Sequence, residues 1–414
     1  VLSNVSIVDL GQIPENAPNV FPGISGATTE QKQALAGMIV WNTNDCLAPK
    51  GDGLYVWDGS KWNYTGGSDG NYFCVTVPAP QCMPIAVPAV TFMAYNLGAD
   101  AAKLNADYPG LSPAKQQMAY QANNTFSETD ATVYGDLYQW GRRADGHEKR
   151  NNSLIYSGPL NPSDVEVTNG QPKALTGQGR FITVPNGTNN NDWSNPQNNT
   201  LWGNGQLINY NFGSDDGGAV PGSGGYYQKP VKTVNDPCPD GWRVPTQDEW
   251  ERLTDYGCGA PQTAGGSFAI NTSTECQSLS DGLSNSSTNA PLTWVRVKDG
   301  KALSGEWEFG DLVGYAIYRT SDWTAAATGY KDGTNNLYDD TAPEPLLFLP
   351  TNGYRYRVTG MLDNFGLVEL NGHYWSSTVT NNSSLILQLR HDNVNAAYTT
   401  AGRAHGLGVR CVKE

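Results

Sequence analysis

The pattern of apolar and polar positions along the chain predicts many short strands. The final segment, 407–412, reads Leu-Gly-Val-Arg-Cys-Val and alternates as a half-buried strand does. Six short runs of this kind follow one another from 346 to 412: LLFLP, YRYRVTG, GLVEL, HYWSST, SLILQLR and GLGVRCV. We therefore expect the C-terminal part of the chain to be rich in β-structure.

A well-capped helix is predicted at 246–256. Thr246 is a suitable N-cap and Glu249 stands three residues later, which makes a capping box. Acidic residues in the first turn suit the helix dipole, and Gly257 is a typical stop. A second helix is predicted from Pro113 to Tyr120. With the strands, these helices indicate an α+β protein.

The first part of the chain has a hairpin pattern of its own. Strands are predicted at 37–43, 53–57 and 60–65. Asp58-Gly59 is a two-residue turn signal between the last two strands. The segment Gly-Gly-Ser-Asp-Gly at 66–70 then reads as a linker. We therefore expect a small β module and linker at 1–72 and one larger domain at 73–414.

Composition narrows the class of partner. Lys and Arg number 26 and Asp and Glu 40, so the formal net charge is −14. Such a surface repels phosphate backbones, so nucleic acid is not an expected partner. The 12 Trp and 21 Tyr demand burial or stacking, which argues against a disordered acidic tail. No apolar stretch reaches the roughly 18 residues of a membrane helix, so no transmembrane segment is expected.

The cysteines indicate an oxidising compartment. The seven cysteines lie at 46, 74, 82, 238, 258, 276 and 411. No Cys-x-x-Cys occurs and the histidines are scattered, so no metal site is predicted. Disulfides formed in the periplasm or outside the cell are favoured. The chain also begins at Val1 without Met, as expected if a signal peptide has been removed.

One cysteine precedes the predicted helix and another lies in the terminal strand, which favours a bridge between Cys238 and Cys411. It would close a loop of roughly 170 residues and stabilise the fold by up to about 5 kcal/mol. Further pairs are predicted, Cys258 with Cys276 and Cys74 with Cys82, which leaves Cys46 unpaired. Several free buried thiols remain the alternative.

Five blocks of sequence resemble a known family. They are VTFMAYNLGA at 90–99, YGDLYQWGR at 134–142, CPDGWRVPT at 238–246, YWSST at 374–378 and VRCVK at 409–413. Their order is that of the Fibrobacter-type major paralogous domain (FISUMP), which occurs on secreted and surface proteins of gut and oral bacteria. The resemblance implies a C-type-lectin-like fold whose loops on one side carry binding. Long polar insertions at 145–235 and 258–345 depart from the family pattern.

The same fold hosts formylglycine-generating enzymes, which use a cysteine pair. Cys238 and Cys411 lie in blocks that look structural, so an enzyme of this kind is only an alternative. Sugar-binding C-type lectins hold calcium with Glu-Pro-Asn and Trp-Asn-Asp motifs. Here Glu344-Pro345 is followed by Leu346 and no Trp-Asn-Asp occurs, so no cofactor is expected. A structural calcium ion at Asp215-Asp216 or Asp339-Asp340 is the alternative.

The predicted binding region lies between the last two blocks. Its side chains suited to directional contacts are Asn381, Asn382, His391, Asn393, Asn395, Tyr398 and Arg403. The stretch also resembles the variable C-terminal region of diversity-generating retroelement targets. Aromatic and Arg anchors dominate interfaces, so Tyr398 and Arg403 are the expected hot spots. Ordinary solvated hairpin loops are the alternative interpretation.

Other residues receive structural roles or lower rank. Trp242 and Trp375 are expected in the core, and His147 is expected to make structural hydrogen bonds. The insertion with Trp193 and Trp202 is the next candidate for binding. The titratable residues show no spacing along the sequence that is recognisable as that of a catalytic site.

The sequence thus predicts an exported, non-catalytic binding protein of a bacterial cell surface or outer membrane. It would be an adhesin, for example at a fimbrial tip, which recognises a host or bacterial surface glycan or protein and can meet fimbrial partner subunits. The alternatives are an enzyme on the same scaffold, formylglycine-generating-like or glycan-hydrolysing, and a structural pilus subunit.

Overall fold

The computed structural model describes most of the C-terminal two thirds of the chain and parts of the rest. The described residues are 4–5, 30, 33–42, 53–59, 62–66, 72–75, 90–125, 127, 129–165, 167–168, 171–172, 177–203, 231–253, 268–269, 292–303, 313–362, 371–380, 383–390, 393–395 and 400–414. The chain divides into two compact units. The first comprises Val1–Thr76 with Ala89–Ala94, and the second comprises Val77–Pro88 with Tyr95–Glu414. Whether each part folds alone stays a prediction.

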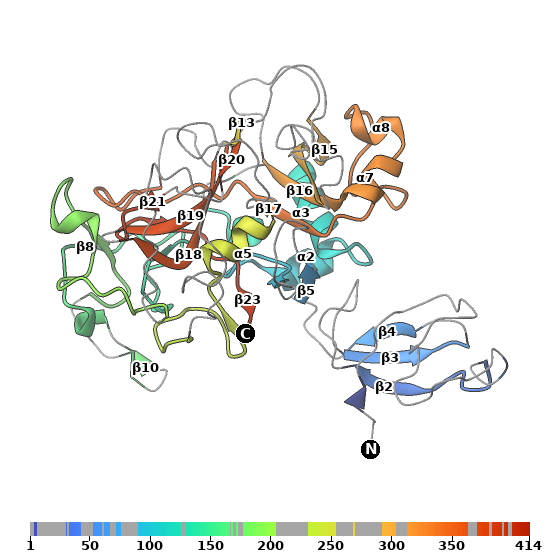
Figure 1. Cartoon of the computed structure of the whole chain (residues 1–414), viewed down its shortest axis with the longest axis horizontal. Coiled ribbons are helices and arrows are strands. Elements are labelled where there is room, and N and C mark those ends of the chain that lie inside the picture. The colour runs from blue at the N-terminus through green and yellow to red at the C-terminus, as the bar shows by residue number, and fades with distance from the viewer. Residues whose placement is uncertain are drawn as a thin grey trace, which may run out of the picture. The chain divides into compact units, whose positions relative to one another are not determined.

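The first unit contains a sheet in the order β1-β2-β3-β4 (Figure 1). Its strands are β1 (Asn4–Val5), β2 (Ile39–Asn42), β3 (Gly53–Trp57) and β4 (Trp62–Gly66). β1 runs parallel to β2, and the other pairs are antiparallel. Trp57 pairs with Trp62, so four residues connect these strands and not the predicted two. The two indole rings are buried, with centres 5.4 Å apart, and form the core of the hairpin. A second hairpin of this unit joins β5 (Tyr72–Val75) to β6 (Val90–Met93).

The second unit combines short helices with small sheets, so the predicted α+β class is confirmed. Its helices are α2 (Ala101–Asp107), α3 (Pro113–Asn123), α4 (Ala131–Tyr134), α5 (Gln247–Arg252), α7 (Thr320–Ala325) and α8 (Thr328–Lys331), with 3-10 turns η1 (Pro162–Val165) and η2 (Asn189–Asn191). In the described part of the chain, no helix has the length and apolar character needed to cross a membrane.

Both predicted helices are present. α3 starts after the N-cap Ser112, whose hydroxyl accepts from the Lys115 N–H, and it continues past the predicted end at Tyr120. α5 has the predicted capping box: the Thr246 N–H donates to Glu249 Oε2 at 2.8 Å and the Glu249 N–H donates to Thr246 Oγ1 at 3.4 Å. Residues 254–257, at the predicted end of this helix, lie outside the described part.

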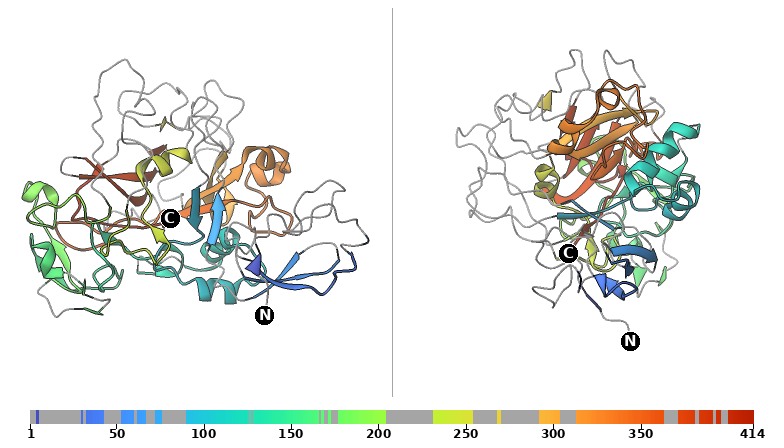
Figure 2. Two further views of the ribbon diagram at one scale, coloured as in Figure 1. Left: turned by 60° about the horizontal axis from the view of Figure 1, so that its bottom comes forward. Right: turned by 90° about the vertical axis from the view of Figure 1, so that its right-hand side faces the viewer.

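Two larger sheets form the centre of the second unit. One has the order β15-β14-β16-β17, with β14 (Leu292–Lys298), β15 (Lys301–Ala302), β16 (Gly314–Arg319) and β17 (Leu347–Pro350). The other has the order β13-β20-β19-β18, with β13 (Phe268–Ala269), β18 (Asn371–Thr380), β19 (Ser383–Arg390) and β20 (Asn393–Asn395), and β21 (Thr400–Ala401) also pairs with β19. α3 packs against β17, and α5 packs against β18 and β19 (Figure 1). α7 packs against β14 and β16, and α8 against β15 (Figure 2).

The described residues also form three two-stranded sheets. They are β7 (Tyr138–Gln139) with β22 (Gly406–Leu407), β8 (Ile155–Ser157) with β11 (Phe181–Thr183), and β9 (Val167–Thr168) with β10 (Gln171–Pro172). β12 (Trp242–Arg243) pairs antiparallel with β23 (Val412–Lys413). The terminal segment also runs beside β18, where the main-chain N–H of Trp375 donates to Gly408 O at 3.0 Å. A Cβ at Gly408 would collide with the Asn352 amide, so this close approach requires glycine.

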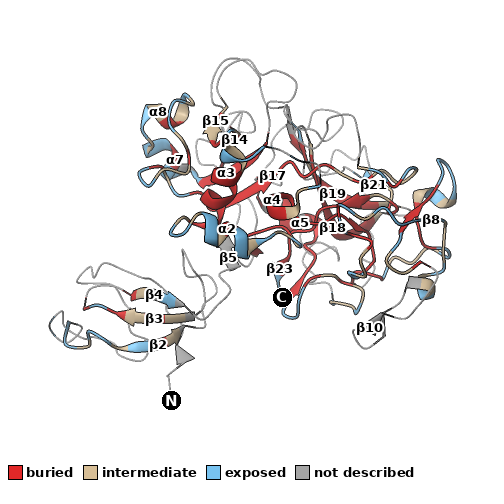
Figure 3. Ribbon diagram, turned by 180° about the vertical axis from the view of Figure 1, so that it is seen from behind, coloured by how far each residue is buried: buried red, intermediate tan, exposed pale blue. Residues whose placement is uncertain are grey.

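Tryptophans join distant segments of the buried core, whose backbone is coloured red in Figure 3. The rings of Trp140, Trp202 and Trp375 follow one another at 5.5 and 6.4 Å. A buried indole N–H group needs an acceptor, and each of these three donates to a main-chain carbonyl of a distant segment. The acceptors are Ser376 O for Trp140, Asn235 O for Trp202 and Tyr138 O for Trp375. The predicted core position of Trp375 is confirmed, as is that of Trp242.

The Cys238–Cys411 disulfide is present, with the two Cα atoms 6.0 Å apart and a sequence separation of 173 residues. It fastens the segment before α5 to the terminal segment, where β12 pairs with β23. This prediction is confirmed. The other predicted pairs lie outside the described part of the structure: Cys258, Cys276 and Cys82 are not described, nor is the side chain of Cys74, and Cys46 is not described either.

Candidate functional site

The predicted binding stretch borders the β18–β19 hairpin. β19 pairs with β20 through Gln388 and Asn395, and with β21 through Leu385 and Thr400. Asn381, Asn382, His391 and Tyr398 lie outside the described residues. Asn393 and Asn395 belong to β20, but their side chains are not described. The structure therefore fixes the strands that carry this stretch, and the role of these six side chains stays a prediction.

Arg403 does not fit the predicted role of a surface anchor. Its side chain is 0% exposed, and its guanidinium lies 4.5 Å from the centre of the Trp140 ring. Nη1 lies 3.2 Å from Asp192 Oδ2, and Nη2 donates to Asn199 Oδ1 at 2.5 Å. A buried arginine with a carboxylate and an aromatic partner holds segments together, so Arg403 leaves the set of contact candidates.

The insertion with Trp193 and Trp202 is also part of the interior. Each indole is 1% exposed. The indole N–H of Trp193 donates to Trp140 O at 2.7 Å, which anchors the insertion to the segment after β7. The expectation that these rings form a second binding surface is wrong, because polar neighbours in sequence said nothing about their burial.

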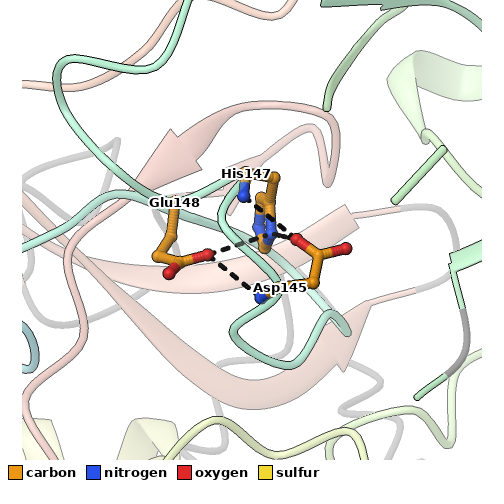
Figure 4. A group of neighbouring side chains, drawn as sticks. All are labelled: Asp145, His147 and Glu148. Atoms are coloured by element: carbon orange, nitrogen blue, oxygen red, sulfur yellow. Dashed lines mark hydrogen bonds and ion pairs between the residues drawn. The ribbon is translucent and has the colours of Figure 1, made fainter. Parts of the chain in front are cut away.

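A first histidine cluster lies in the turn after β7 and consists of Asp145, His147 and Glu148 (Figure 4). His147 Nδ1 is 2.6 Å from Asp145 Oδ1, and His147 Nε2 accepts from the Gln139 N–H at 3.1 Å. Glu148 Oε2 accepts from the N–H groups of Gly146 and Asp145, at 2.9 and 3.2 Å. Every nitrogen of the imidazole therefore has a partner in the protein.

The charges of this Asp145 cluster are also balanced internally. Arg142 Nη2 lies 2.6 Å from Asp145 Oδ2, and both side chains are 1% exposed. Burial alone would raise the pKa of Asp145, but its interactions with His147 and Arg142 hold that pKa well below its usual range. Burial and the Arg142 charge lower the pKa of His147 despite the nearby carboxylates. The result is an ionised carboxylate beside a neutral imidazole whose proton is on Nδ1.

These three side chains can be tested as a metal centre. Their ligand atoms lie within 4.8 Å of one another. A metal-bound imidazole needs a nitrogen with a free lone pair, and Nε2 of His147 uses its lone pair to accept from Gln139. Nδ1 is engaged with Asp145 at hydrogen-bonding distance. The donor set therefore fits a structural cluster, which is the role predicted for His147.

Among the described residues, this is the only group of three His, Cys, Asp or Glu side chains that converges. Asp339 and Asp340 therefore have no third ligand of these types within the described part. Asp215 and Asp216, the other proposed calcium loop, lie outside it.

A second histidine cluster was missed from the sequence. Tyr354 contacts two histidine rings edge to face, with ring centres 5.1 Å from His373 and 5.5 Å from His405. Tyr356 lies 5.5 Å from His405. We call Tyr354, Tyr356, Arg357, His373, Gln388 and His405 the Tyr354 cluster. These residues come from three parts of the domain: the segment after β17, the β18–β19 hairpin and the turn before β22.

The alternation of side chains along 353–357 builds this cluster. Arg355 points inward and is 3% exposed; its guanidinium lies 4.4 Å from the centre of the Phe181 ring and donates to His147 O at 3.1 Å. In extended chain, neighbouring side chains point to opposite faces, so Tyr354 and Tyr356 share the other face and are partly exposed. The Tyr-Arg-Tyr-Arg pattern was the available signal.

The Tyr354 cluster has a one-sided charge environment. Arg357 lies 5.7 Å from the centre of the Tyr356 ring and donates to Val184 O and Asn186 Oδ1. Burial first, and Arg390 second, lower the pKa of His373 to about 4. Burial, then Arg357 and His373, lower the pKa of His405 to about 3. No carboxylate of the described residues acts on either ring.

Both histidines also have a nitrogen that has no partner in the described part of the structure. His373 Nδ1 and His405 Nδ1 are buried and make no hydrogen bond to the described residues. His373 Nε2 is 3.0 Å from Gln388 Nε2. Since both imidazoles are neutral at pH 7, each offers one donor and one acceptor. The cluster therefore has unused hydrogen-bonding capacity.

The Fibrobacter succinogenes major domain matches residues 89–413, which is more than three quarters of the chain. The chain belongs to this family. The predicted FISUMP membership is confirmed, and all five sequence blocks fall within the matched residues. No curated protein and no solved structure was found to match the chain. The Fibrobacter succinogenes major domain thus contains both histidine clusters, the disulfide and the β18–β19 hairpin.

Proposed function

We propose that this protein is an exported binding protein of a bacterial surface, an adhesin that recognises a glycan or a protein through one side of a C-type-lectin-like domain. The family domain, its α+β class and its disulfide support this proposal. Attachment at a fimbrial tip, with fimbrial subunits as partners, belongs to the same proposal.

The observation that carries the proposal is the Tyr354 cluster. It offers partly exposed tyrosine rings together with imidazole nitrogens that make no hydrogen bond to the described residues. Through Gln388 it also borders the predicted binding stretch, because Gln388 contacts His373 and pairs with Asn395 of β20. Binding groups on the β18–β19 hairpin and on the segment after β17 would thus serve one ligand surface.

The bonding of the other reactive groups favours binding over catalysis. Cys238 and Cys411 are joined in a buried disulfide, whereas a thiol catalyst needs an accessible thiolate. In the Asp145 cluster, Glu148 accepts a hydrogen bond from the N–H of Gly146 in its own turn, and Asp145 pairs with Arg142. These observations support a non-enzymatic role against the alternatives of formylglycine-generating or glycan-hydrolysing chemistry.

A glycan and host-protein array probed with the full chain tests the proposal. We expect saturable binding to a restricted set of ligands, and loss of that binding in Tyr356→Ala. Trp375→Phe, a change in the core, serves as the matched control and should bind normally. An empty array, together with hydrolysis or modification of glycans or peptides by the purified chain, would overturn the proposal in favour of the enzyme.

A further inference from the structure

We propose that the Tyr354 cluster binds an acidic saccharide, a sugar that carries a carboxylate or a sulfate. Arg357 would face the anionic group, and Tyr356 and His405 would contact the sugar ring. This inference rests on the proposed binding function and names the class of ligand.

Charge is the first argument. The chain has a net charge of −14, yet the charged groups that act on the two histidines are Arg357 and Arg390. Arg357 contacts no carboxylate of the described residues: its partners are Val184 O, Asn186 Oδ1 and the Tyr356 ring. A guanidinium that meets no carboxylate in the described part of an acidic protein can bind an anion, and its planar fork suits a carboxylate or sulfate.

Unused hydrogen-bonding groups are the second argument. His373 is 8% exposed, and a buried polar atom without a partner costs about 1–3 kcal/mol. Where the structure describes the chain, the Nδ1 atoms of His373 and His405 both lack a hydrogen-bond partner. Sugar hydroxyls both donate and accept, so a saccharide that reaches these rings directly, or through a retained water molecule, recovers part of this cost.

The shape of the aromatic groups is the third argument. Tyr356, Tyr354 and His405 present rings inclined to one another, at 75° between Tyr354 and His405 and 43° between Tyr356 and His405. A sugar has an apolar C–H face and polar hydroxyl edges, which match ring faces and the adjacent polar atoms. A phosphate polymer fits less well, because the acidic surface of the protein repels a long polyanion.

The test uses the full chain and calorimetric titration with matched sugars. Galacturonic acid against galactose reports a carboxylate, and galactose sulfate against galactose reports a sulfate. We expect one acidic member to bind at least about tenfold more tightly than its neutral counterpart. Arg357→Gln should remove this tenfold preference, and Tyr356→Ala should weaken both members of the pair.

Arg319→Gln, which changes an exposed arginine at the end of β16, is the matched control and should keep the preference. Equal affinity for acidic and neutral sugars, or an equal loss for both in Arg357→Gln, would overturn the inference and leave the proposed binding function intact. Binding of a poly-glutamate peptide but of no saccharide would show that the ligand class is wrong. An empty array with no binding to any of these probes would overturn the proposed function as well.

Discussion

The two histidine clusters of the domain place the same side chain in opposite surroundings. His147 lies between Asp145 and the Gln139 N–H, and both its nitrogens are engaged. Among the described residues, the Nδ1 atoms of His373 and His405 have no hydrogen-bond partner, and the charged groups that act on these rings are arginines and not carboxylates. The first arrangement satisfies itself and holds a turn in place. The second leaves capacity for a ligand, although burial lowers the pKa in both.

The largest effect is expected when the ion pair of the Asp145 cluster is broken, because the charges of this cluster are balanced within the protein. Asp145→Ala removes the carboxylate beside Arg142 and leaves that guanidinium buried without its counter-charge. We expect a loss of about 3–5 kcal/mol in the free energy of unfolding, measured by urea denaturation. Asp107→Ala, which breaks the exposed pair with Lys103, should leave the urea midpoint unchanged. If both variants lose the same free energy of unfolding, the Asp145 cluster does not stabilise the turn after β7.

The next largest effect is a loss of stability in acid, which tests the surroundings of His373 in the Tyr354 cluster. The pKa of His373 is about 4 in the folded protein, below the ordinary value of about 6.5. As the pH falls below about 6.5, the unfolded chain takes up the proton first, so stability is lost between about pH 6.5 and pH 4. The loss from this residue is about 3 kcal/mol.

Urea unfolding at a series of pH values measures this loss. His373→Gln should flatten the curve in that window, because glutamine does not titrate. An unchanged slope in the variant would mean that other groups cause the acid loss.

A smaller effect separates the histidines at neutral pH. His147→Gln disrupts two hydrogen bonds inside a buried cluster and should lower stability by about 1–3 kcal/mol. His405→Gln removes a ring whose Nδ1 makes no hydrogen bond to the described residues, so the loss of stability should be smaller. Thermal melting of the two variants side by side gives the ranking, and the reverse order would contradict the comparison.

The last prediction is that adding or removing metal ions does not shift the melting temperature. Because both nitrogens of His147 are engaged, zinc addition or treatment with EDTA should leave the melting temperature of the protein unchanged. A rise with zinc that disappears in His147→Gln would show that the Asp145 cluster rearranges to hold the metal.

Local patterns predicted the features that depend on neighbours in sequence. The capping box at Thr246 and Glu249 and the helix from Pro113 follow from residues a few positions apart. The family blocks predicted the structural role of His147 as well. The C-type-lectin-like fold and the identity of the ligand remain proposals.

Features assembled from distant segments could not be predicted in this way. Arg403 looked like a surface contact because its neighbours are polar, but the turn from Gly402 to His405 directs it toward Asp192. The Tyr354 cluster joins residues from the segment after β17, the β18–β19 hairpin and the last turn. The Tyr-Arg-Tyr-Arg pattern indicates only which side chains of the first segment share a face, and no spacing in the sequence predicts that the three segments meet. Tertiary packing decides which side chains of an alternating segment face inward.

The Cys238–Cys411 bond also determines how the chain carries mechanical load. When tension acts between the two ends, it passes from residue 238 through the sulfurs to residue 411, so the intervening covalent chain is bypassed. That bypassed segment includes the β18–β19 hairpin and the Tyr354 cluster. At about 3.4 Å per residue, a separation of 173 residues withholds roughly 590 Å of contour length from extension.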